Sequence, residues 1–106
     1  MRLLIRTMED TRFLVTREAA EKLDNHGRPR VDKRTGEALY AVQVTALDAT
    51  GAEVLNVTVA GFPPKVTVGQ YVSLVDLEAI PWTQDGRSGV AFRAKEIVPV
   101  TNVKAA

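Results

Sequence analysis

Polar and apolar residues alternate along two stretches in the middle of the chain. Leu39 to Leu47 reads LYAVQVTAL, and Glu53 to Ala60 reads EVLNVTVA. A period of two is typical of β-strands that bury one face. Asp48 to Gly51, between them, has the composition of a turn, and its glycine can adopt a positive φ. The pattern therefore predicts an antiparallel β-hairpin.

A longer patterned stretch, Gly69 to Ile97, predicts two further strands. The first runs from Tyr71 to Ala79 and changes its buried face near Val75, as a strand does at a bulge. We expect Pro81 to end or kink this strand, because proline lacks a backbone N–H. Asp85 to Gly89 is then a short loop that leads into the last strand.

The last strand, Val90 to Val98, has an apolar side and a cationic side. The apolar side is formed by Val90, Phe92 and Ala94, and the other side by Ala91, Arg93 and Lys95. Alternation predicts that the first set packs in a core and that the second faces water.

The beginning of the chain is patterned less clearly. Leu3 to Ile5 and Arg12 to Val15 are short apolar runs that predict one interrupted strand or two brief ones. Thr16 is a suitable cap for a short helix over Arg17 to Asp24, which contains mostly good helix formers. Asn25 to Gly27 would stop that helix.

The most basic stretch is Gly27 to Glu37, which reads GRPRVDKRTGE. Its proline, its glycines and its lack of large apolar anchors predict a flexible loop or a protruding hairpin. Two interpretations are equally open, a solvated loop that keeps the domain soluble and a basic arm that meets a polyanion. Residues 99–106 are expected to form a loose tail.

These elements together predict an all-β domain spanning residues 1–106, with at most one short helix. About five long strands match a small antiparallel barrel, closed or partly open, and the oligonucleotide-binding (OB) fold is the first candidate. Two prolines in Gly61 to Val68 leave no room for a helix between the third and fourth strands. An SH3-like barrel or a small sandwich is the alternative.

Composition narrows the function only slightly. The 14 basic and 13 acidic residues give a formal charge of +1, so a polyanion partner would have to be recognised by local clusters. The chain has no cysteine, which excludes disulfides and thiolate chemistry. The first ten residues resemble neither a signal peptide nor a membrane span, and a cytoplasmic location is expected.

Catalysis is not predicted. His26 is the sole histidine, and Ser73 and Ser88 are the only serines, neither of them in a nucleophile-elbow sequence. Gly86 to Gly89 lacks the lysine and spacing of a phosphate-binding loop. We therefore expect no metal site and no cofactor.

Single-stranded nucleic acid is bound through aromatic faces that stack on bases and through cations that meet phosphates. The side chains of both kinds that the sequence offers for this are Arg28, Arg30, Lys33, Arg34, Tyr40, Phe62, Lys65, Trp82, Arg87, Arg93 and Lys95. Tyr40 fits a core position equally well, and the arginines near the C-terminus could instead pair with Asp76, Glu78 or Asp85.

Three motifs carry a resemblance to a known group: TGEALY at Thr35 to Tyr40, the Pro81-Trp82 pair, and GRSGVAFRA at Gly86 to Ala94. Across Thr35 to Ile97 the chain resembles small actinobacterial accessory proteins, often called regulatory, that plasmids and integrative conjugative elements encode. The resemblance implies a mobile-element setting. The predicted topology is also similar to OB-fold single-stranded DNA-binding domains, a likeness that assigns no residues.

Two functions remain open. The first is non-catalytic binding of single-stranded DNA, or of RNA, in replication, transfer or excision of the element. The second is a protein-interaction or assembly module whose barrel edge or Pro-Pro loop recruits an element-encoded replication or transfer protein. Either is compatible with a homodimer that pairs sheet edges beside Leu3 to Ile5 or along the last strand.

Overall fold

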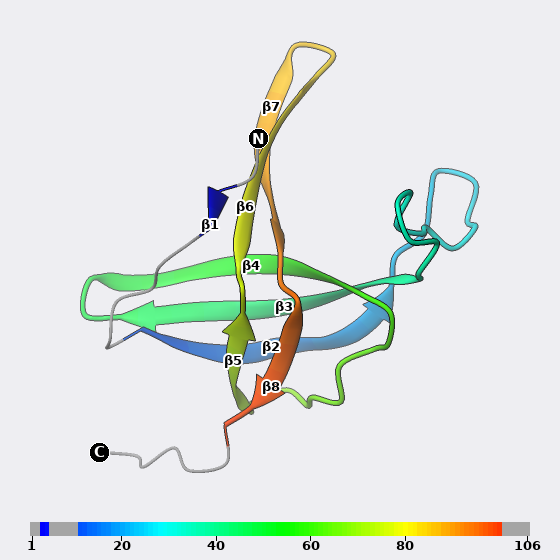
Figure 1. Cartoon of the computed structure of the whole chain (residues 1–106). Helices are drawn as coiled ribbons and strands as arrows, with labels where there is room; N and C mark the ends of the chain where they lie inside the picture. The colour runs from blue at the N-terminus through cyan, green and yellow to red at the C-terminus, as the bar shows by residue number, and fades with distance from the viewer. Residues whose placement is uncertain (1–2, 5–10, 101–106) are drawn as a thin grey trace.

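The computed structural model describes residues 3–4 and 11–100. They form one β-sheet of eight strands and contain no helix (Figure 1). The strands are β1 (Leu3–Leu4), β2 (Arg12–Glu21), β3 (Leu39–Asp48), β4 (Gly51–Ala60), β5 (Tyr71–Val75), β6 (Glu78–Gln84), β7 (Arg87–Arg93) and β8 (Glu96–Pro99). Their order in the sheet is β1-β6-β7-β4-β3-β2-β5-β8.

Strands β2, β3 and β4 form an antiparallel layer, as the alternating sequence predicted. The β3–β4 hairpin is paired over its whole length, from Leu39 opposite Ala60 to Asp48 opposite Gly51. Every second residue faces inward, and the side chains of Val42, Val44 and Val57 are completely buried. The β-hairpin prediction is thus confirmed.

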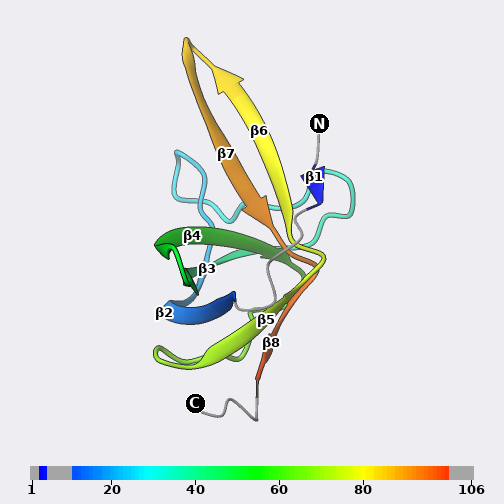
Figure 2. The ribbon, with the colours of Figure 1, turned by 90° about the vertical axis from the view of Figure 1, so that its left-hand side faces the viewer.

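In the second half of the chain, β5 continues into β6 and β7 continues into β8. These two bent runs cross the β2–β4 layer (Figures 1 and 2). Only Asp76 and Leu77 separate β5 from β6, and Asp76 has a positive φ of 50° at the point where the sequence predicted a bulge. Strand β5 pairs with β2 and β8, whereas β6 pairs with β7. Strand β7 then runs parallel to β4, opposite Val57 and Thr58.

The hydrophobic core lies between the β2–β4 layer and the strands that cross it. Its buried members, drawn from both halves of the chain, are Phe13, Val15, Val42, Val44, Leu55, Val57, Val59, Val66, Val72, Leu77, Ala94 and Ile97. Phe92 packs against this cluster while remaining half-buried, so its predicted core position is correct in part. Val90 is 51% exposed, and the prediction that it packs in the core is wrong.

The predicted helix over Arg17 to Asp24 is also wrong. Those residues extend β2, which continues to Glu21 and pairs with β3 through Ala20 and Ala41. Two register shifts, on either side of Arg17, let β2 curve along its partner. As a helix the segment could bury only Ala19, Ala20 and Leu23, so pairing with β3 outweighs its local helix propensity.

The β6–β7 hairpin differs from its prediction at two places. Strand β6 continues past Pro81, which pairs with Val90 of β7 and lies beyond Ala79, the last residue of β6 that pairs with the described part of β1. The predicted loop Asp85 to Gly89 shrinks to Asp85 and Gly86, with φ values of 52° and 75°. Two positive φ angles in an Asp-Gly pair are typical of a tight type I′ turn.

The hydrogen-bonded strands form an open series from β1 to β8, and a closed five-stranded barrel is not confirmed. Strand β8 includes Pro99, and Val100 donates its N–H to the Tyr71 carbonyl, so the sheet extends into the first two residues of the predicted tail. Residues 101–106 of that tail, and residue 5 of the predicted first strand, lie outside the described residues.

Candidate functional site

The basic segment between β2 and β3 is folded by short-range hydrogen bonds. Asp24 accepts the backbone N–H groups of His26 and Arg28 at 2.8 and 3.0 Å, and its own N–H bonds to the Arg28 carbonyl. Bridges join Leu23 to Pro29 and Val31 to Ala38. The segment therefore consists of two tight turns above the end of the sheet, which we call the basic loop (residues 24–37).

Asp32 is the structural centre of the basic loop. Its Oδ1 accepts the N–H groups of Arg34 and Thr35, and its Oδ2 accepts a hydrogen bond from Arg93 Nη2 at 2.5 Å. Asp32 is 8% exposed, and among the described residues it is the one charged residue that is buried. The side-chain hydrogen bond from Arg93, followed by the backbone N–H of Arg34, lowers the pKa of Asp32 to about 2.

This ion pair joins two parts of the molecule that are 61 residues apart in sequence. Arg93 is the last residue of β7, so its guanidinium ties the basic loop to the base of the β6–β7 hairpin. In Figures 1 and 2 the hairpin and the basic loop rise on the same side of the β2–β4 layer. The expectation that Arg93 faces water is wrong, since its side chain is only 25% exposed and its partner is Asp32.

Trp82 lies on the β6–β7 hairpin directly opposite Gly89. A Cβ atom at Gly89 would come within 2.7 Å of Trp82 Cζ2 and 2.9 Å of Cε2, so the indole rests on the glycine backbone. The tryptophan is nevertheless 43% exposed. One side of the ring is thus fixed by the hairpin, and much of the ring remains accessible.

The register of the hairpin places several candidate residues on the face that carries Trp82. Gln84 is opposite Arg87, Trp82 is opposite Gly89, and Glu78 is opposite Arg93. Directly opposed residues and those two positions away share a face of an antiparallel pair. Trp82, Arg87 and Arg93 therefore share one face, with Trp82 about 13 Å along the ribbon from Arg93 at roughly 3.3 Å per residue.

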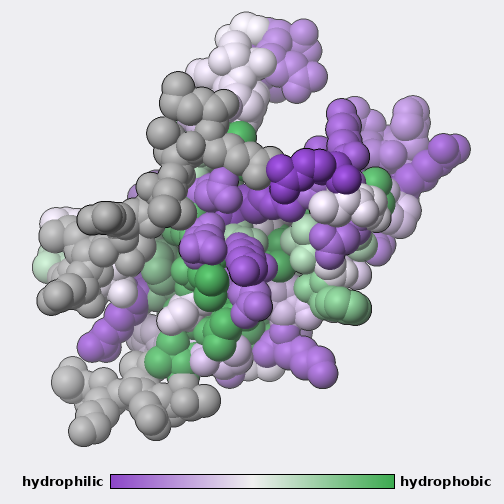
Figure 3. Space-filling view, viewed as in Figure 1, coloured by the Kyte–Doolittle hydropathy of each residue, from purple (hydrophilic) through white to green (hydrophobic). Residues whose placement is uncertain are grey.

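The other candidate residues are divided between this region and its surroundings. Arg28, Arg30, Lys33 and Arg34 are all exposed on the basic loop, and Figure 3 shows hydrophilic residues gathered there and at the hairpin tip. Tyr40 is half-buried at the start of β3.

The β4–β5 connection contributes two more exposed candidates. Phe62 is 86% exposed and follows Gly61, whose N–H bonds to the Ala38 carbonyl beside the basic loop. Lys65 is exposed further along the same connection, and Lys95 is exposed at the bend between β7 and β8. Phe62 therefore lies at the same end of the sheet as the basic loop.

Sequence reasoning missed Asp32 and Gly89, although a signal for each was present. Asp32 is the acid that precedes a Lys-Arg-Thr-Gly turn, a position at which aspartate often accepts backbone N–H groups. Gly89 could have been found by taking Asp85-Gly86 as a two-residue turn, because counting outward from it pairs Trp82 with Gly89.

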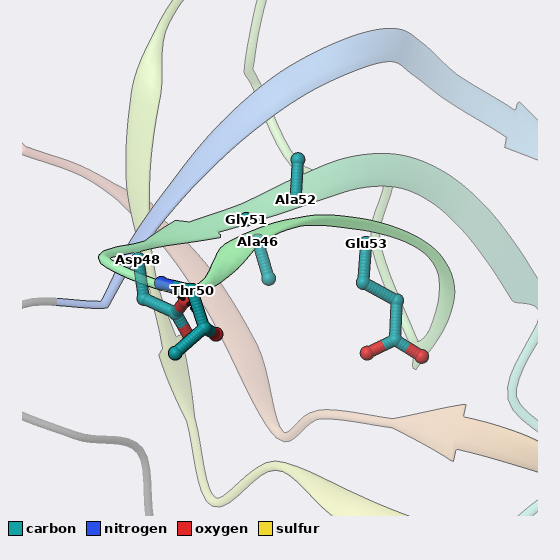
Figure 4. Close-up of a pocket in the computed structure, with 6 residues that line it drawn as sticks. All are labelled: Ala46, Asp48, Thr50, Gly51, Ala52 and Glu53. Carbon is teal, nitrogen blue, oxygen red and sulfur yellow. Dashed lines mark hydrogen bonds between the residues drawn. The ribbon is translucent and has the colours of Figure 1, made fainter.

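The opposite end of the β3–β4 hairpin is acidic. Figure 4 shows Asp48 beside Thr50, with Glu53 further along β4, around a small open hollow of about 170 Å³. The Thr50 hydroxyl and N–H donate to Asp48 Oδ1 at 2.6 and 2.8 Å. Both bonds lower the pKa of that carboxyl, and the hydroxyl bond has the larger effect. Within the described residues no group of three His, Asp or Glu side chains could hold a metal ion.

The part of the chain that the structure describes holds no helix long and apolar enough to cross a bilayer. Comparison of the chain with protein-family models, with curated proteins and with solved structures gave no match.

Proposed function

We propose that this protein is a non-catalytic binder of single-stranded nucleic acid, and that the strand lies across the basic loop and the Trp82 face of the β6–β7 hairpin. The observation that carries the proposal is the Asp32–Arg93 ion pair. It holds a cluster of exposed cations beside a ribbon whose accessible indole lies on the same face as Arg93. Cations and an accessible ring within reach of one strand are what such binding needs.

The connectivity supports a partly open barrel of the OB type beneath this surface. In this interpretation β5 with β6, and β7 with β8, each act as one bent strand. The Ala94 N–H bonds to the Thr58 carbonyl and the Lys95 N–H to the Val75 carbonyl, so hydrogen bonding continues at the bend between β7 and β8. One bent strand pairs with β2 and the other with β4, which places them against both edges of the β2–β4 layer.

Trp82 supplies the stacking position in this proposal. The Gly89 backbone restrains the indole before any ligand arrives, so little side-chain entropy is lost when a base stacks on it. Base–aromatic stacking is worth about 1 to 3 kcal/mol per base and tolerates any sequence. Phe62 offers a second exposed ring beside the basic loop.

The basic loop supplies the phosphate contacts. Within residues 3–4 and 11–100, no hydrogen bond or ion pair engages the side chains of Arg28, Arg30, Lys33 or Arg34. These cations can therefore neutralise phosphates without giving up an internal partner. Each phosphate so neutralised releases a counterion, which makes the affinity fall as salt rises.

Titration of Trp82 fluorescence with a ten-nucleotide single strand at 50 and 200 mM salt tests the proposal. Trp82 is the sole tryptophan, so its emission reports directly on the hairpin. We expect quenching on binding and a clear loss of affinity at the higher salt. Absence of binding at 50 mM salt would reject the function.

Charge reversal at Arg30 and Arg34 together tests the basic loop. The double change to glutamate should lower affinity by a similar factor for every strand sequence, because phosphate contacts carry no sequence information. Single Arg34→Glu and Arg12→Glu variants form a matched pair, since both alter an exposed arginine and Arg12 lies at the far end of β2. Equal effects of the two would remove the loop from the binding surface.

One observation favours the alternative function, an assembly module. Beyond its base the β6–β7 hairpin has no neighbouring strand among the described residues, and it exposes Val90 as well as Trp82. Exposed strand edges can pair with a strand of a partner. A role as an accessory of a plasmid or conjugative element, for either function, rests on the sequence resemblance.

A further inference from the structure

A hollow opens where the β6–β7 hairpin leaves the sheet. Strand β7 pairs with β4 only at Phe92 and Arg93, so the strands diverge on the side toward Gly89 (Figure 2). The space between them has a volume of about 460 Å³. Its lining residues, contributed by β3, β4, β7 and the residue that follows β2, are Lys22, Ala41, Val54, Asn56, Thr58, Val90, Ala91 and Phe92. It lies on the outward face of β4, away from the core.

The walls of the hollow combine apolar sides with one free amide. Val54 and Val90 are each more than half exposed, and Phe92 is half-buried. The Asn56 side chain is exposed and makes no hydrogen bond within the described residues. Apolar walls with a few polar groups that fix orientation are typical of sites for small ring systems. A flat heterocycle could contact the apolar walls and pair its edge with the amide.

Lys22 lines one end of the hollow, and Arg30 lies next to it because the two residues are joined by a backbone hydrogen bond. Lys22 Nζ donates to Thr58 Oγ1 at 3.1 Å, and the Lys22 carbonyl accepts the Arg30 N–H at 2.8 Å. Partial burial, and then the nearby Arg30 charge, lowers the pKa of Lys22. An anion placed near both side chains would relieve their repulsion and would form charge-assisted hydrogen bonds.

From these observations we infer that the hollow between β4 and β7 holds one unpaired adenine of the bound strand, with Asn56 pairing its edge and Lys22 and Arg30 meeting the adjoining phosphate. This inference rests on the proposed function and adds a base-reading position to it. Adenine is the base expected because an asparagine amide can pair with its N6 and N7 atoms together. Trp82 and the basic loop would provide affinity for any single strand, whereas Asn56 would provide the preference for adenine.

Fluorescence polarisation with labelled ten-nucleotide strands tests the inference, comparing all-thymine strands with strands that carry one adenine. We expect the native protein to bind the best-placed adenine strand at least fivefold more tightly, since a bidentate pair gives about 1 to 3 kcal/mol of discrimination. Asn56→Ala should abolish that preference, because the adenine strand then loses its bidentate pair and binds no more tightly than the all-thymine strand. Asn25→Ala, the same change at an exposed asparagine outside the hollow, should keep the preference.

The cationic end has its own readout. Lys22→Gln should reduce the slope of log affinity against log salt by up to about 0.7, the full contribution of one phosphate on a single strand, because Arg30 still faces that phosphate. An unchanged slope would overturn the phosphate contact. Thermal unfolding of each variant shows whether it is folded. If Lys22→Gln is unfolded, the inference is tested by Asn56→Ala.

The outcomes separate this inference from the proposed function. If strands bind and the native protein shows no adenine preference, or Asn56→Ala retains it, the hollow is not a base site and the proposed function stands. If no strand binds at 50 mM salt but adenosine monophosphate shifts the NMR signals of Asn56 and Ala91, the hollow takes a nucleotide and the proposed function is rejected. If neither ligand has an effect, both are overturned.

Discussion

The β3–β4 and β6–β7 hairpins have similar alternating sequences and different surroundings. In β3–β4, the inward residues Val42, Val44 and Val57 are completely buried, because they share one core cluster with residues of β5 and β8. In β6–β7, Trp82 and Val90 are about half exposed, because the ribbon extends beyond the layer that covers its base. One hairpin builds the core, and the other presents side chains.

This difference shows why alternation alone does not identify a buried face. A period of two establishes that a strand has two unlike sides, but burial needs a second layer of structure at the same place. An isolated two-stranded ribbon is marginal in water. The outer part of β6–β7 therefore depends on its turn at Asp85-Gly86, on Trp82 against Gly89 and on the contact of Arg93 with Asp32.

The largest expected effect contrasts one valine from each hairpin. Val57→Ala should lower the free energy of unfolding by about 2 to 3 kcal/mol, because it removes two buried carbon groups and leaves a cavity. Val90→Ala, with the same chemical change at a half-exposed site, should cost about 0.5 kcal/mol or less. Urea unfolding of both variants measures the contrast. Equal losses would show that the hairpin packs in the core after all.

A smaller effect is expected at the support of the indole. Gly89→Ala places a Cβ where Trp82 Cζ2 and Cε2 now lie, so the ring has to move away from β7. The stability cost should be about 1 kcal/mol. Trp82 emission should shift to longer wavelength as the ring becomes more hydrated. Ser88→Ala, at the neighbouring exposed position, is the control that should leave the emission unchanged.

The smallest expected effect is a pH dependence confined to the contact between the basic loop and the hairpin. The folded pKa of Asp32 is about 2, below the ordinary aspartate value of about 3.9, so the ionised carboxylate stabilises the fold. Its contribution should be complete above about pH 4 and be lost as the pH falls toward 2. NMR signals of the Arg34 and Thr35 amides, which bond to Asp32, should follow this titration.

Asp32→Asn is the variant that sharpens this last comparison. It removes the charge that meets Arg93 but keeps a side-chain oxygen that can accept backbone N–H groups. The same amides should then show no titration between pH 2 and 4. A titration that persists in the variant would assign the pH dependence to another acid.

The all-β class, the β3–β4 hairpin, the bend near Asp76 and the basic character of residues 27–37 could be predicted from the sequence, because these follow from local spacing and turn chemistry. The sequence did not determine that Arg17 to Glu21 extends β2, that Val90 is exposed or that Asp32 binds Arg93. These features follow from the three-dimensional arrangement, since each depends on which distant segment lies alongside. Strand pairing and ion pairing act through space, and a linear pattern carries no record of the neighbour across the sheet.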